Sequence, residues 1–464
     1  MKIKFCGATR NVTGSKHLIT TDAGSRILLD CGLFQGRRAE TREKNKNFLF
    51  TPSKLDAVIL GHAHIDHSGN LPNLSKNGYR KIIHATTPTD ALVHYMLPDS
   101  AYIQERDAEF INKKNKRRGL PPVEPLYSTA DALDVIRQIR PHRLNQWFRV
   151  ADDVEIKFVE AGHILGAALT LIRIGQGSKK IKIAYIVDLG RKNLPLLNDP
   201  HQIRGVDYAI IESTYGNRDH DNIYKAKDQL AEVINRTYER GGKIIIPSFA
   251  VERTQEIIYF IHELTRDGAI PNIKIFIDSP LAVNITSVFE QYIEWFDDET
   301  QAYYKRGDNP FGSAEIEYVR SVDRSKELNR IDHPAIIISA SGMAEAGRVL
   351  HHLANNIENP KNTIMIVGFM AQNTLGRKLA DGWKEVPILG DKYKVRAEVV
   401  VSHSFSAHAD RTELLQYAKG LGKVKKIFVV HGEETQALEF GMHLQGLKNI
   451  GEVFVPHEGD EAEL

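Results

Sequence analysis

Three histidines and one aspartate fall within the six residues from His62 to His67. The apolar segment from Leu55 to Leu60 precedes them and is typical of a buried strand. Metal-binding side chains therefore follow a strand end, and do not stand one turn apart on a helix. A structural zinc takes four protein ligands and a catalytic zinc three, so this loop predicts two metal ions that share it. Imidazole with carboxylate favours zinc over iron or manganese. The alternative, solvated histidines on a polar loop, is disfavoured by the density of ligands.

Length and composition indicate a soluble, globular, multidomain protein. A chain of 464 residues is too long for one simple core. No run approaches the length of a membrane span, and the start, Met1 to Phe5, leads directly into strand-like sequence, so a cytoplasmic location is expected. Cys6 and Cys31 are the only cysteines and form no C-x-x-C pair. We interpret both as packed small side chains, and expect neither a disulfide framework nor a cysteine zinc site.

Charge is balanced overall but uneven along the chain. The 61 basic and 59 acidic residues leave a formal net charge of +2, which by itself does not indicate a polyanionic partner. One short stretch is strongly basic and contains Lys113, Lys114, Lys116, Arg117 and Arg118. A solvated face is the favoured interpretation of this run, and a nucleic-acid contact is the alternative.

The order of strand and helix patterns predicts an α/β fold. Strands are expected near residues 3–5, 16–20, 26–29, 154–159 and 182–187. A helix is expected over 128–139, with Ser128 as its cap and Asp131 three residues later. From about 215 to 396 apolar strands alternate regularly with helices, as in a parallel sheet. Two final strands, at 398–401 and 426–430, follow this block. The middle block is therefore interpreted as a second domain inserted into the first.

Acidic and histidine side chains follow many of these strands. In α/β sheets functional groups gather at the carboxyl ends of strands. One such residue alone is more often a cap or a structural hydrogen-bonding group. Together with the histidine-rich loop, seven positions predict a shared site: Asp30, His163, Asp188, Glu212, His403, His408 and His431.

These motifs resemble a known family. The run His62 to His67 resembles the H-x-H-x-D-H signature of the metallo-β-lactamase fold. The segments 212–216, 406–408 and 430–432 resemble three further motifs of its β-CASP branch of nucleases, and 278–282 and 339–343 resemble sequences of the β-CASP cap domain. The resemblance covers essentially the whole chain. It implies an αββα sandwich, formed by 1–214 and 397–464, with an inserted Rossmann-like parallel α/β cap at 215–396.

The resemblance also implies a set of ligands for two zinc ions per chain. One zinc would be held by His62, His64 and His163, and the other by Asp66, His67 and His431. Asp188 would bridge the two ions. Asp30 resembles the carboxylate outside the ligand set that holds the ligand loop in place.

The catalytic roles that the resemblance implies concern phosphodiester hydrolysis. Two metals that share a water supply a nucleophile and relieve negative charge on the phosphoryl oxygens, so the ligand Asp66 is also counted as catalytic. His408 would be the general acid, and Glu212 would orient it and favour its protonated form. Phosphate contacts are expected at Ser341 and Gly342, just before a helical stretch, and at Ser406. Residues 372–377 could contact phosphate too, although family members often have glycine where Asn373 stands.

The predicted function is a zinc-dependent ribonuclease that acts on single-stranded RNA. The last motif favours RNA, because Artemis-type DNA nucleases carry an apolar residue where this chain has His431. The alternatives are a DNA-directed β-CASP nuclease, a small-molecule metallohydrolase and an RNA-binding subunit without catalysis. Internal and 5′-exonucleolytic cutting both stay open, and a homodimer is compatible with the sequence.

Overall fold

The computed structural model describes residues 1–36, 38–175, 180–220, 223–368, 370, 373–402 and 404–464. The chain forms two compact units. The first comprises Met1–Lys192, Asp199–Asp219 and Ala407–Leu464, and the second comprises Asn193–Asn198 and His220–Ser406. The middle of the chain is therefore inserted into the first unit, and the two units are described separately below.

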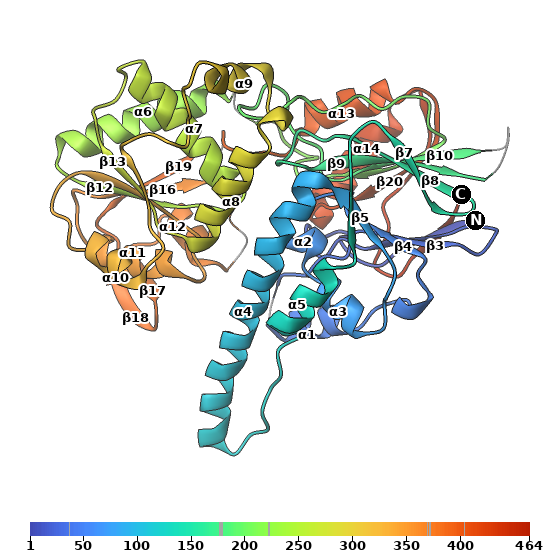
Figure 1. The fold of residues 1–464 in the computed structure, drawn as a ribbon, viewed down its shortest axis with the longest axis horizontal. Helices are drawn as coiled ribbons and strands as arrows, with labels where there is room; N and C mark the ends of the chain where they lie inside the picture. Colours follow the sequence, from blue (N-terminus) through green and yellow to red (C-terminus); the bar gives the residue numbers. More distant parts are fainter. Residues whose placement is uncertain (37, 176–179, 221–222, 369, 371–372, 403) are drawn as a thin grey trace. The chain divides into compact units, whose positions relative to one another are not determined.

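Two seven-stranded sheets build the first unit (Figure 1). In spatial order the first sheet contains β22 (Glu461–Glu463), β1 (Lys2–Phe5), β2 (His17–Thr20), β3 (Arg26–Leu29), β4 (Ala57–Ile59), β5 (Ile83–Thr86) and β6 (Ile139–His142). The second contains β21 (Ile450–Phe454), β20 (Val424–Val430), β11 (Tyr208–Glu212), β10 (Ile181–Ile186), β9 (Ala168–Ile174), β8 (Val154–Glu160) and β7 (Trp147–Ala151).

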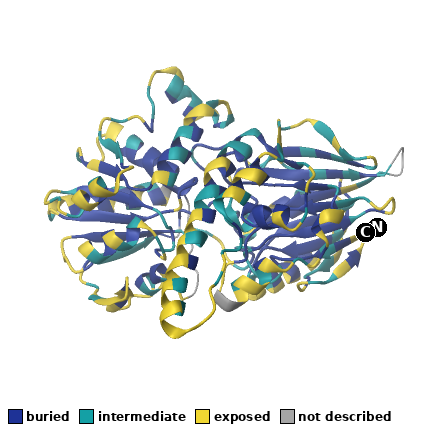
Figure 2. Ribbon diagram, turned by 60° about the horizontal axis from the view of Figure 1, so that its bottom comes forward, coloured by how far each residue is buried: buried dark blue, intermediate teal, exposed yellow. Residues whose placement is uncertain are grey.

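The sheets face each other across the main hydrophobic core. Ile27 and Ile59 of the first sheet share one buried cluster with Ile172 and Ile183 of the second. Figure 2 shows the strands of this unit largely buried and the outer sides of its helices exposed. Those helices are α1 (Arg38–Lys46), α2 (Ile65–Ser68), α3 (Leu71–Lys76), α4 (Thr87–Arg118) and α5 (Thr129–Ile136) on the side of the first sheet, and α13 (Arg411–Gly420) and α14 (Glu434–Gln445) on the side of the second. The short 3-10 helix Pro52–Lys54 precedes β4. The expected αββα sandwich is confirmed.

Strand direction decides where the side chains of the site can meet. In the second sheet β7 to β10 pair antiparallel, whereas β10, β11, β20 and β21 pair parallel. The carboxyl ends of β10, β11 and β20 therefore lie side by side. Asp188, Glu212 and His431 stand at or just beyond those ends.

The second unit is a parallel α/β sheet. Its order is β14 (Ile316–Tyr318), β13 (Lys274–Ile277), β15 (Ala335–Ser339), β12 (Lys243–Pro247), β16 (Thr363–Val367) and β19 (Glu398–Ser402), and every pair is parallel. Figure 1 shows α6 (Tyr224–Glu239) and α7 (Arg253–Arg266) over one face, and α10 (Val322–Leu328), α11 (Arg348–Asn356) and α12 (Leu375–Ala380) over the other. The unit also contains α8 (Pro280–Gln291), the 3-10 helix Ile293–Trp295, α9 (Asp298–Lys305) and the hairpin of β17 (Glu385–Ile388) with β18 (Asp391–Lys394).

The unit boundaries differ from the expected 215–396. Strand β19 hydrogen-bonds along its length with β16, so the chain up to Ser406 belongs to the second unit. Segment Asn193–Asn198 joins this unit as well, because the backbone N–H of Asp297 donates to the carbonyl of Leu196 at 3.0 Å. Long-range pairing of this kind leaves no mark in the local sequence pattern.

The predicted helix near 128–139 is confirmed as α5, and its Ser128–Asp131 capping box is present. Cys6 and Cys31 are both buried and free, as expected. Among the described residues no helix combines the length and hydrophobicity that a membrane span requires.

Candidate metal centre

The histidine-rich loop begins where the buried strand β4 ends. Its first two histidines, His62 and His64, lie in irregular chain as the sequence predicts. Asp66 and His67 differ from the prediction, because they lie in the single helical turn α2. The Ser68 hydroxyl donates to the carbonyl oxygens of Ala63 and His64 at 2.8 and 3.0 Å, which closes this turn. A four-residue turn is too short to show a helical hydrophobic period, so the pattern could not reveal it.

The first cluster consists of His62, His64, His163 and Asp188. His64 Nδ1 lies 3.1 Å from His62 Nε2 and 3.3 Å from His163 Nε2. Asp188 Oδ2 lies 3.6 Å from His62 Nε2 and 3.5 Å from His163 Nε2. The four ligand atoms thus converge on one small volume.

The second cluster consists of Asp66, His67 and His431. The Nε2 atoms of His67 and His431 are 3.0 Å apart. Asp66 Oδ2 lies 3.8 Å from His67 Nε2 and 3.5 Å from His431 Nε2. Asp188 Oδ2, already part of the first cluster, lies 3.4 Å from His67 Nε2. One carboxylate therefore faces both clusters.

The spacing of these atoms fits a metal ion. Zinc bonds of about 2.0 to 2.1 Å at tetrahedral angles place neighbouring ligand atoms about 3.3 to 3.4 Å apart. The separations of 3.0 to 3.8 Å within the clusters are of this size. Pairs of imidazole nitrogens also face each other with only one proton between them at most, whereas a cation accepts the lone pairs of both.

Burial keeps the first group of imidazoles neutral. It lowers the pKa of His62 and His163 well below the usual range, and lowers the pKa of His64 to about 4. Neutral imidazole is the form that binds a metal. These residues therefore offer lone pairs at neutral pH without having to lose protons first.

The second group combines negative charge with a basic imidazole. Burial lowers the pKa of His67, but the carboxylates of Asp188 and Asp66 outweigh it and hold that pKa well above the usual range. Burial raises the pKa of Asp66, but His67 and His431 hold it at about 2. The same two histidines hold the pKa of Asp188 well below its usual range against burial. Ionised carboxylates thus create a potential that attracts cations.

The carboxylate of Asp30 is hydrogen-bonded to the loop that carries the metal-binding histidines. Its Oδ2 accepts from His67 Nδ1 at 2.8 Å and from the hydroxyl of Tyr185 at 2.7 Å, and its Oδ1 accepts from the backbone N–H of Gly61 at 2.8 Å. Both Asp30 and His67 are completely buried. The contact directs Nδ1 of His67 to Asp30 and turns Nε2 toward His431.

His408 and Glu212 form a pair beside the clusters. His408 Nδ1 lies 3.2 and 3.1 Å from the two carboxylate oxygens of Glu212. Glu212 is completely buried, and its Oε1 also accepts from the backbone N–H of Leu189 at 2.6 Å. Burial lowers the pKa of His408, but Glu212 and Asp188 outweigh it and raise that pKa to about 9. This imidazole is therefore protonated at neutral pH, unlike those of the first cluster.

Backbone contacts hold the two halves of the site together. The chain at His408 forms an isolated antiparallel bridge with Gly190, two residues after Asp188. A Cβ on Gly190 would stand 1.8 Å from the carbonyl oxygen of Gly162, beside His163, and a Cβ on Gly32 would stand 1.5 Å from that of Asp66. Only glycine permits such close approach of ligand-bearing loops.

The remaining predicted residues belong to the second unit or lie outside the described residues. Ser341, Gly342 and Ser406 belong to the second unit. Helix α11 begins at Arg348 and not directly after Gly342, because Ala344 and Gly347 form turns of positive φ in between. Asn373 has a φ of 69°, a left-handed conformation that glycine and asparagine tolerate. Two residues named in the sequence analysis, His403 and Gln372, lie outside the described residues.

Two residues that contribute to the site were not predicted from the sequence. Tyr185, which hydrogen-bonds Asp30, lies in the middle of β10 and looks like an ordinary core aromatic. Thr214 Oγ1 lies 3.2 Å from His431 Nδ1, and its place two residues after Glu212 was the only available signal.

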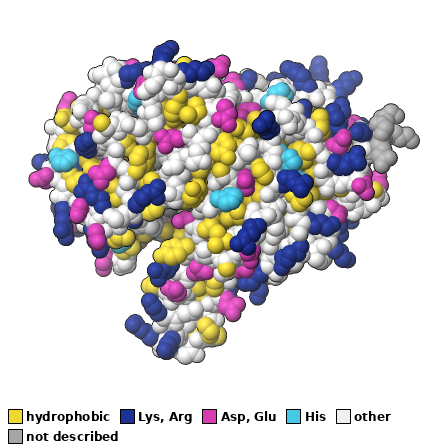
Figure 3. Space-filling model, viewed as in Figure 1, with side chains coloured by type: hydrophobic (Ala, Val, Ile, Leu, Met, Phe, Trp, Pro, Cys, Tyr) yellow, Lys and Arg dark blue, Asp and Glu magenta, His cyan; other side chains and the backbone are white. Residues whose placement is uncertain are grey.

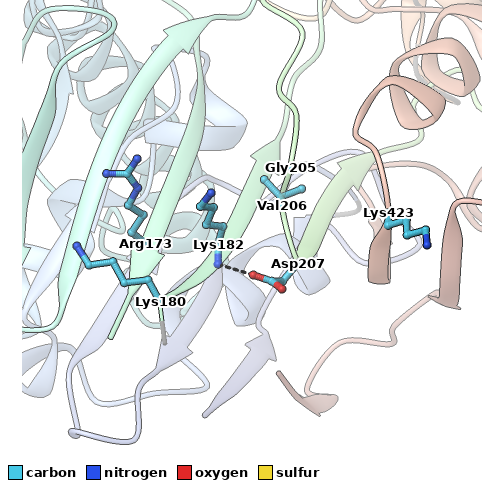
Figure 4. A pocket seen from close by; sticks show the side chains of 7 residues that line it. All are labelled: Arg173, Lys180, Lys182, Gly205, Val206, Asp207 and Lys423. Carbon is cyan, nitrogen blue, oxygen red and sulfur yellow. Dashed lines mark hydrogen bonds between the residues drawn. The ribbon is translucent and has the colours of Figure 1, made fainter. Parts of the chain in front are cut away.

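A basic pocket of about 560 Å³ lies elsewhere in the first unit (Figure 4). Its lining includes Arg173 of β9 and Lys182 of β10, with Asp207 just before β11. These residues stand at the ends of β10 and β11 opposite those that precede Asp188 and Glu212. The pocket is therefore not the metal centre.

Three family models match the chain. The model of the metallo-beta-lactamase superfamily matches residues 14–184, that of the Beta-Casp domain matches 254–379, and that of the Zn-dependent metallo-hydrolase RNA specificity domain matches 392–456. The segment that matches the metallo-beta-lactamase model includes His62 to His67 and His163. The segment that matches the RNA specificity model includes His408 and His431.

Known proteins are similar over nearly the whole chain. Ribonuclease TTHA0252 of Thermus thermophilus is 35% identical over 441 residues, which cover 95% of each chain. Transcription termination factor FttA of Methanosarcina mazei is 30% identical over 456 residues, which cover 95% of this chain and 68% of that protein. A solved structure of a protein of unknown function from Enterococcus faecalis V583 has a TM-score of 0.56 at 13% identity, and the match covers 100% of this chain and 99% of that one. That likeness concerns the fold alone.

Proposed function

Since this chain belongs to the β-CASP branch of the metallo-β-lactamase superfamily, a branch of metallo-hydrolases, we propose that it is a zinc-dependent ribonuclease of RNA processing or decay. Its substrate is single-stranded RNA, and it hydrolyses phosphodiester bonds. The observation that carries this proposal is the contact between His408 and Glu212 beside two clusters of metal-binding side chains.

Two zinc ions per chain are part of the proposal. His62, His64 and His163 would hold one, Asp66, His67 and His431 the other, and Asp188 would bridge them. When bound, the two ions lower the pKa of a shared water and neutralise charge on the phosphoryl oxygens. Asp30 hydrogen-bonds Nδ1 of His67, so Nε2 is the nitrogen that would bind the metal.

Hydrolysis also needs a proton for the departing ribose oxygen. His408 carries that proton, because its pKa of about 9 lies above neutral pH. Its side chain is 21% exposed, whereas that of Glu212 is fully buried. Glu212 therefore cannot reach a substrate itself, and acts by orienting the imidazole and balancing its positive charge.

RNA is favoured over DNA and over small molecules by the comparisons. The model whose description names RNA specificity matches the segment that contains His408 and His431, and the relative from Thermus thermophilus is named a ribonuclease. The parallel α/β second unit exceeds what a small-molecule hydrolase needs around such a centre. We assign Ser341, Gly342 and Ser406 to phosphate binding on the motifs alone.

The test combines a metal count with cleavage of defined RNAs. Zinc-loaded protein is incubated with internally labelled and end-labelled single-stranded RNA that carries either a 5′ phosphate or a 5′ triphosphate, and with DNA of the same sequence. We expect two zinc ions per chain by mass spectrometry, and faster cleavage of RNA than of DNA. The pattern of labelled products distinguishes internal cutting from attack at the 5′ end. Fully loaded protein that leaves every RNA intact would refute the proposal.

A further inference from the structure

Helix α4 of the first unit is longer than its packing requires. It runs over 32 residues from Thr87 to Arg118, and its second half projects beyond the strands of that unit (Figure 1). The segment that follows the helix runs back along one side of this half and is hydrogen-bonded to it. Asn112 exchanges two hydrogen bonds with the backbone of Val123 at 2.9 and 2.7 Å, and Asn115 donates to the carbonyl of Pro121 at 2.8 Å. The projection is thus a braced hairpin, called the α4 arm below (residues 102–127).

The outer side of the arm carries two large aromatic rings that are not buried. Tyr102 is 52% exposed and Phe110 is 55% exposed, although burial of such side chains is strongly favourable. Both lie on one face of the helix together with Arg106, Lys113 and Arg117, because successive members are three or four residues apart. From Tyr102 to Lys113 aromatic and basic side chains thus alternate along this outer face, and a second basic residue, Arg117, follows.

Cations already stand over both rings. The guanidinium of Arg106 lies 5.3 Å from the ring centre of Tyr102, and the ammonium of Lys114 lies 4.3 Å from that of Phe110. Towards the end of the helix the charge is uncompensated. Among the described residues no carboxylate pairs with any of the five cations Lys113, Lys114, Lys116, Arg117 and Arg118. Figure 3 shows basic and hydrophobic side chains side by side on the arm, at the bottom of the view.

From this alternation we infer that the α4 arm is a binding site for single-stranded RNA, separate from the metal centre. Phosphates of the strand lie against Lys113 and Arg117, and bases stack on Tyr102 and Phe110. Any base can stack on an aromatic face, so the site holds RNA without reading its sequence. The inference rests on the proposed function for the class of its ligand, and adds to it a second point of attachment for long substrates.

The distribution of charge argues for RNA and against a lipid surface. A helix that lies in a membrane interface separates an apolar face from a basic one. Here Arg106 stands between Tyr102 and Phe110 on the same face, so insertion of the rings would bury its charge. A strand with alternating phosphates and bases matches the alternating cations and rings instead.

Two double variants test the arm. Tyr102→Ala/Phe110→Ala removes the rings, and its matched control is Leu438→Ala/Met442→Ala, which removes two exposed apolar side chains from α14. Lys113→Ala/Arg117→Ala removes two charges, and its control is Lys419→Ala/Lys423→Ala, at and just after the end of α13. All substitutions are on exposed surface, so the fold is expected to survive.

The readouts are Kd by fluorescence anisotropy, and kcat and KM, for RNAs of about 6 and about 30 nucleotides, since a strand needs several nucleotides to cover the arm. At about fivefold per stacked base, loss of both rings should raise Kd for the long RNA about 25-fold. Loss of two phosphate contacts should reduce the slope of log Kd against log salt by about 1.4. The controls, the short RNA and kcat should keep the parent's values.

An unchanged Kd for the long RNA in both arm variants would overturn the inference. Equal weakening for short and long RNA would overturn it too, because the effect would then arise at the metal centre or in the fold. So would vesicle binding by the parent that the arm variants lose, with RNA binding intact. If the parent cuts no RNA at all, the proposed function fails, yet the Kd comparison still decides whether the arm binds RNA.

Discussion

Replacement of Asp30 by asparagine tests the tautomer argument of the metal centre. The Asp30 carboxylate is completely buried and accepts three hydrogen bonds, from Gly61 N–H, from the Tyr185 hydroxyl and from His67 Nδ1. The carboxamide of asparagine has the same shape but only one oxygen. Whichever way it turns, its NH₂ group faces a donor that the carboxylate satisfied.

The two orientations have different costs. If the NH₂ group faces Gly61, two donors oppose each other, and a buried donor without a partner costs about 1 to 3 kcal/mol of folding free energy. If it faces His67, it favours the tautomer with its proton on Nε2. That nitrogen is the one 3.0 Å from His431 Nε2, where a metal would bind. Loss of such a partner typically reduces metal affinity about 10-fold to 100-fold, or about 1.4 to 2.7 kcal/mol.

The assay for Asp30→Asn is zinc affinity, measured by competition with a chromophoric chelator, next to thermal unfolding of the metal-free protein. We expect one weakened site and one site close to the parent's. Asp56→Asn is the matched control, because Asp56 also accepts a backbone N–H, that of Arg26 at 2.9 Å, but pairs with the exposed Lys81. Parent-like affinity at both sites in Asp30→Asn would refute the tautomer argument.

Three further predictions follow from the same geometry. His64→Ala removes a nitrogen from the first cluster and should lose both metal and activity, which mass spectrometry and RNA cleavage measure together; full metal content would contradict its role as a ligand. Glu212→Gln removes the negative charge that keeps His408 protonated, so the fall in rate with rising pH, expected near the His408 pKa of about 9, should move to lower pH; an unmoved pH–rate profile would contradict the pairing. Ser128→Ala removes the cap of α5 and should lower the free energy of unfolding by about 1 kcal/mol, measured by urea denaturation, with no change in metal content.

Sequence patterns located the strands well where burial is complete. Strands such as Ala335–Ser339 and Thr363–Val367 are apolar on both faces because helices cover both sides of the sheet. The ligand-bearing positions could be predicted because parallel strands bring their carboxyl ends together. Asp188, Glu212 and His431 could thus be grouped from sequence, and the structure brings them together at one edge.

Features that depend on long-range contacts could not be predicted. Helix α4 lacks a continuous apolar stripe and contains Pro98, so its basic end was interpreted as a solvated face and its length could not be predicted.

The most direct test of the account compares the parent with His408→Ala at equal zinc content. Both proteins are loaded with zinc, counted by mass spectrometry and incubated with internally labelled single-stranded RNA. The account predicts two zinc ions in each, and a cleavage rate at least about 100-fold lower in His408→Ala, because only the proton donor is lost. Cleavage by His408→Ala at the parent's rate, with the zinc in place, would contradict it.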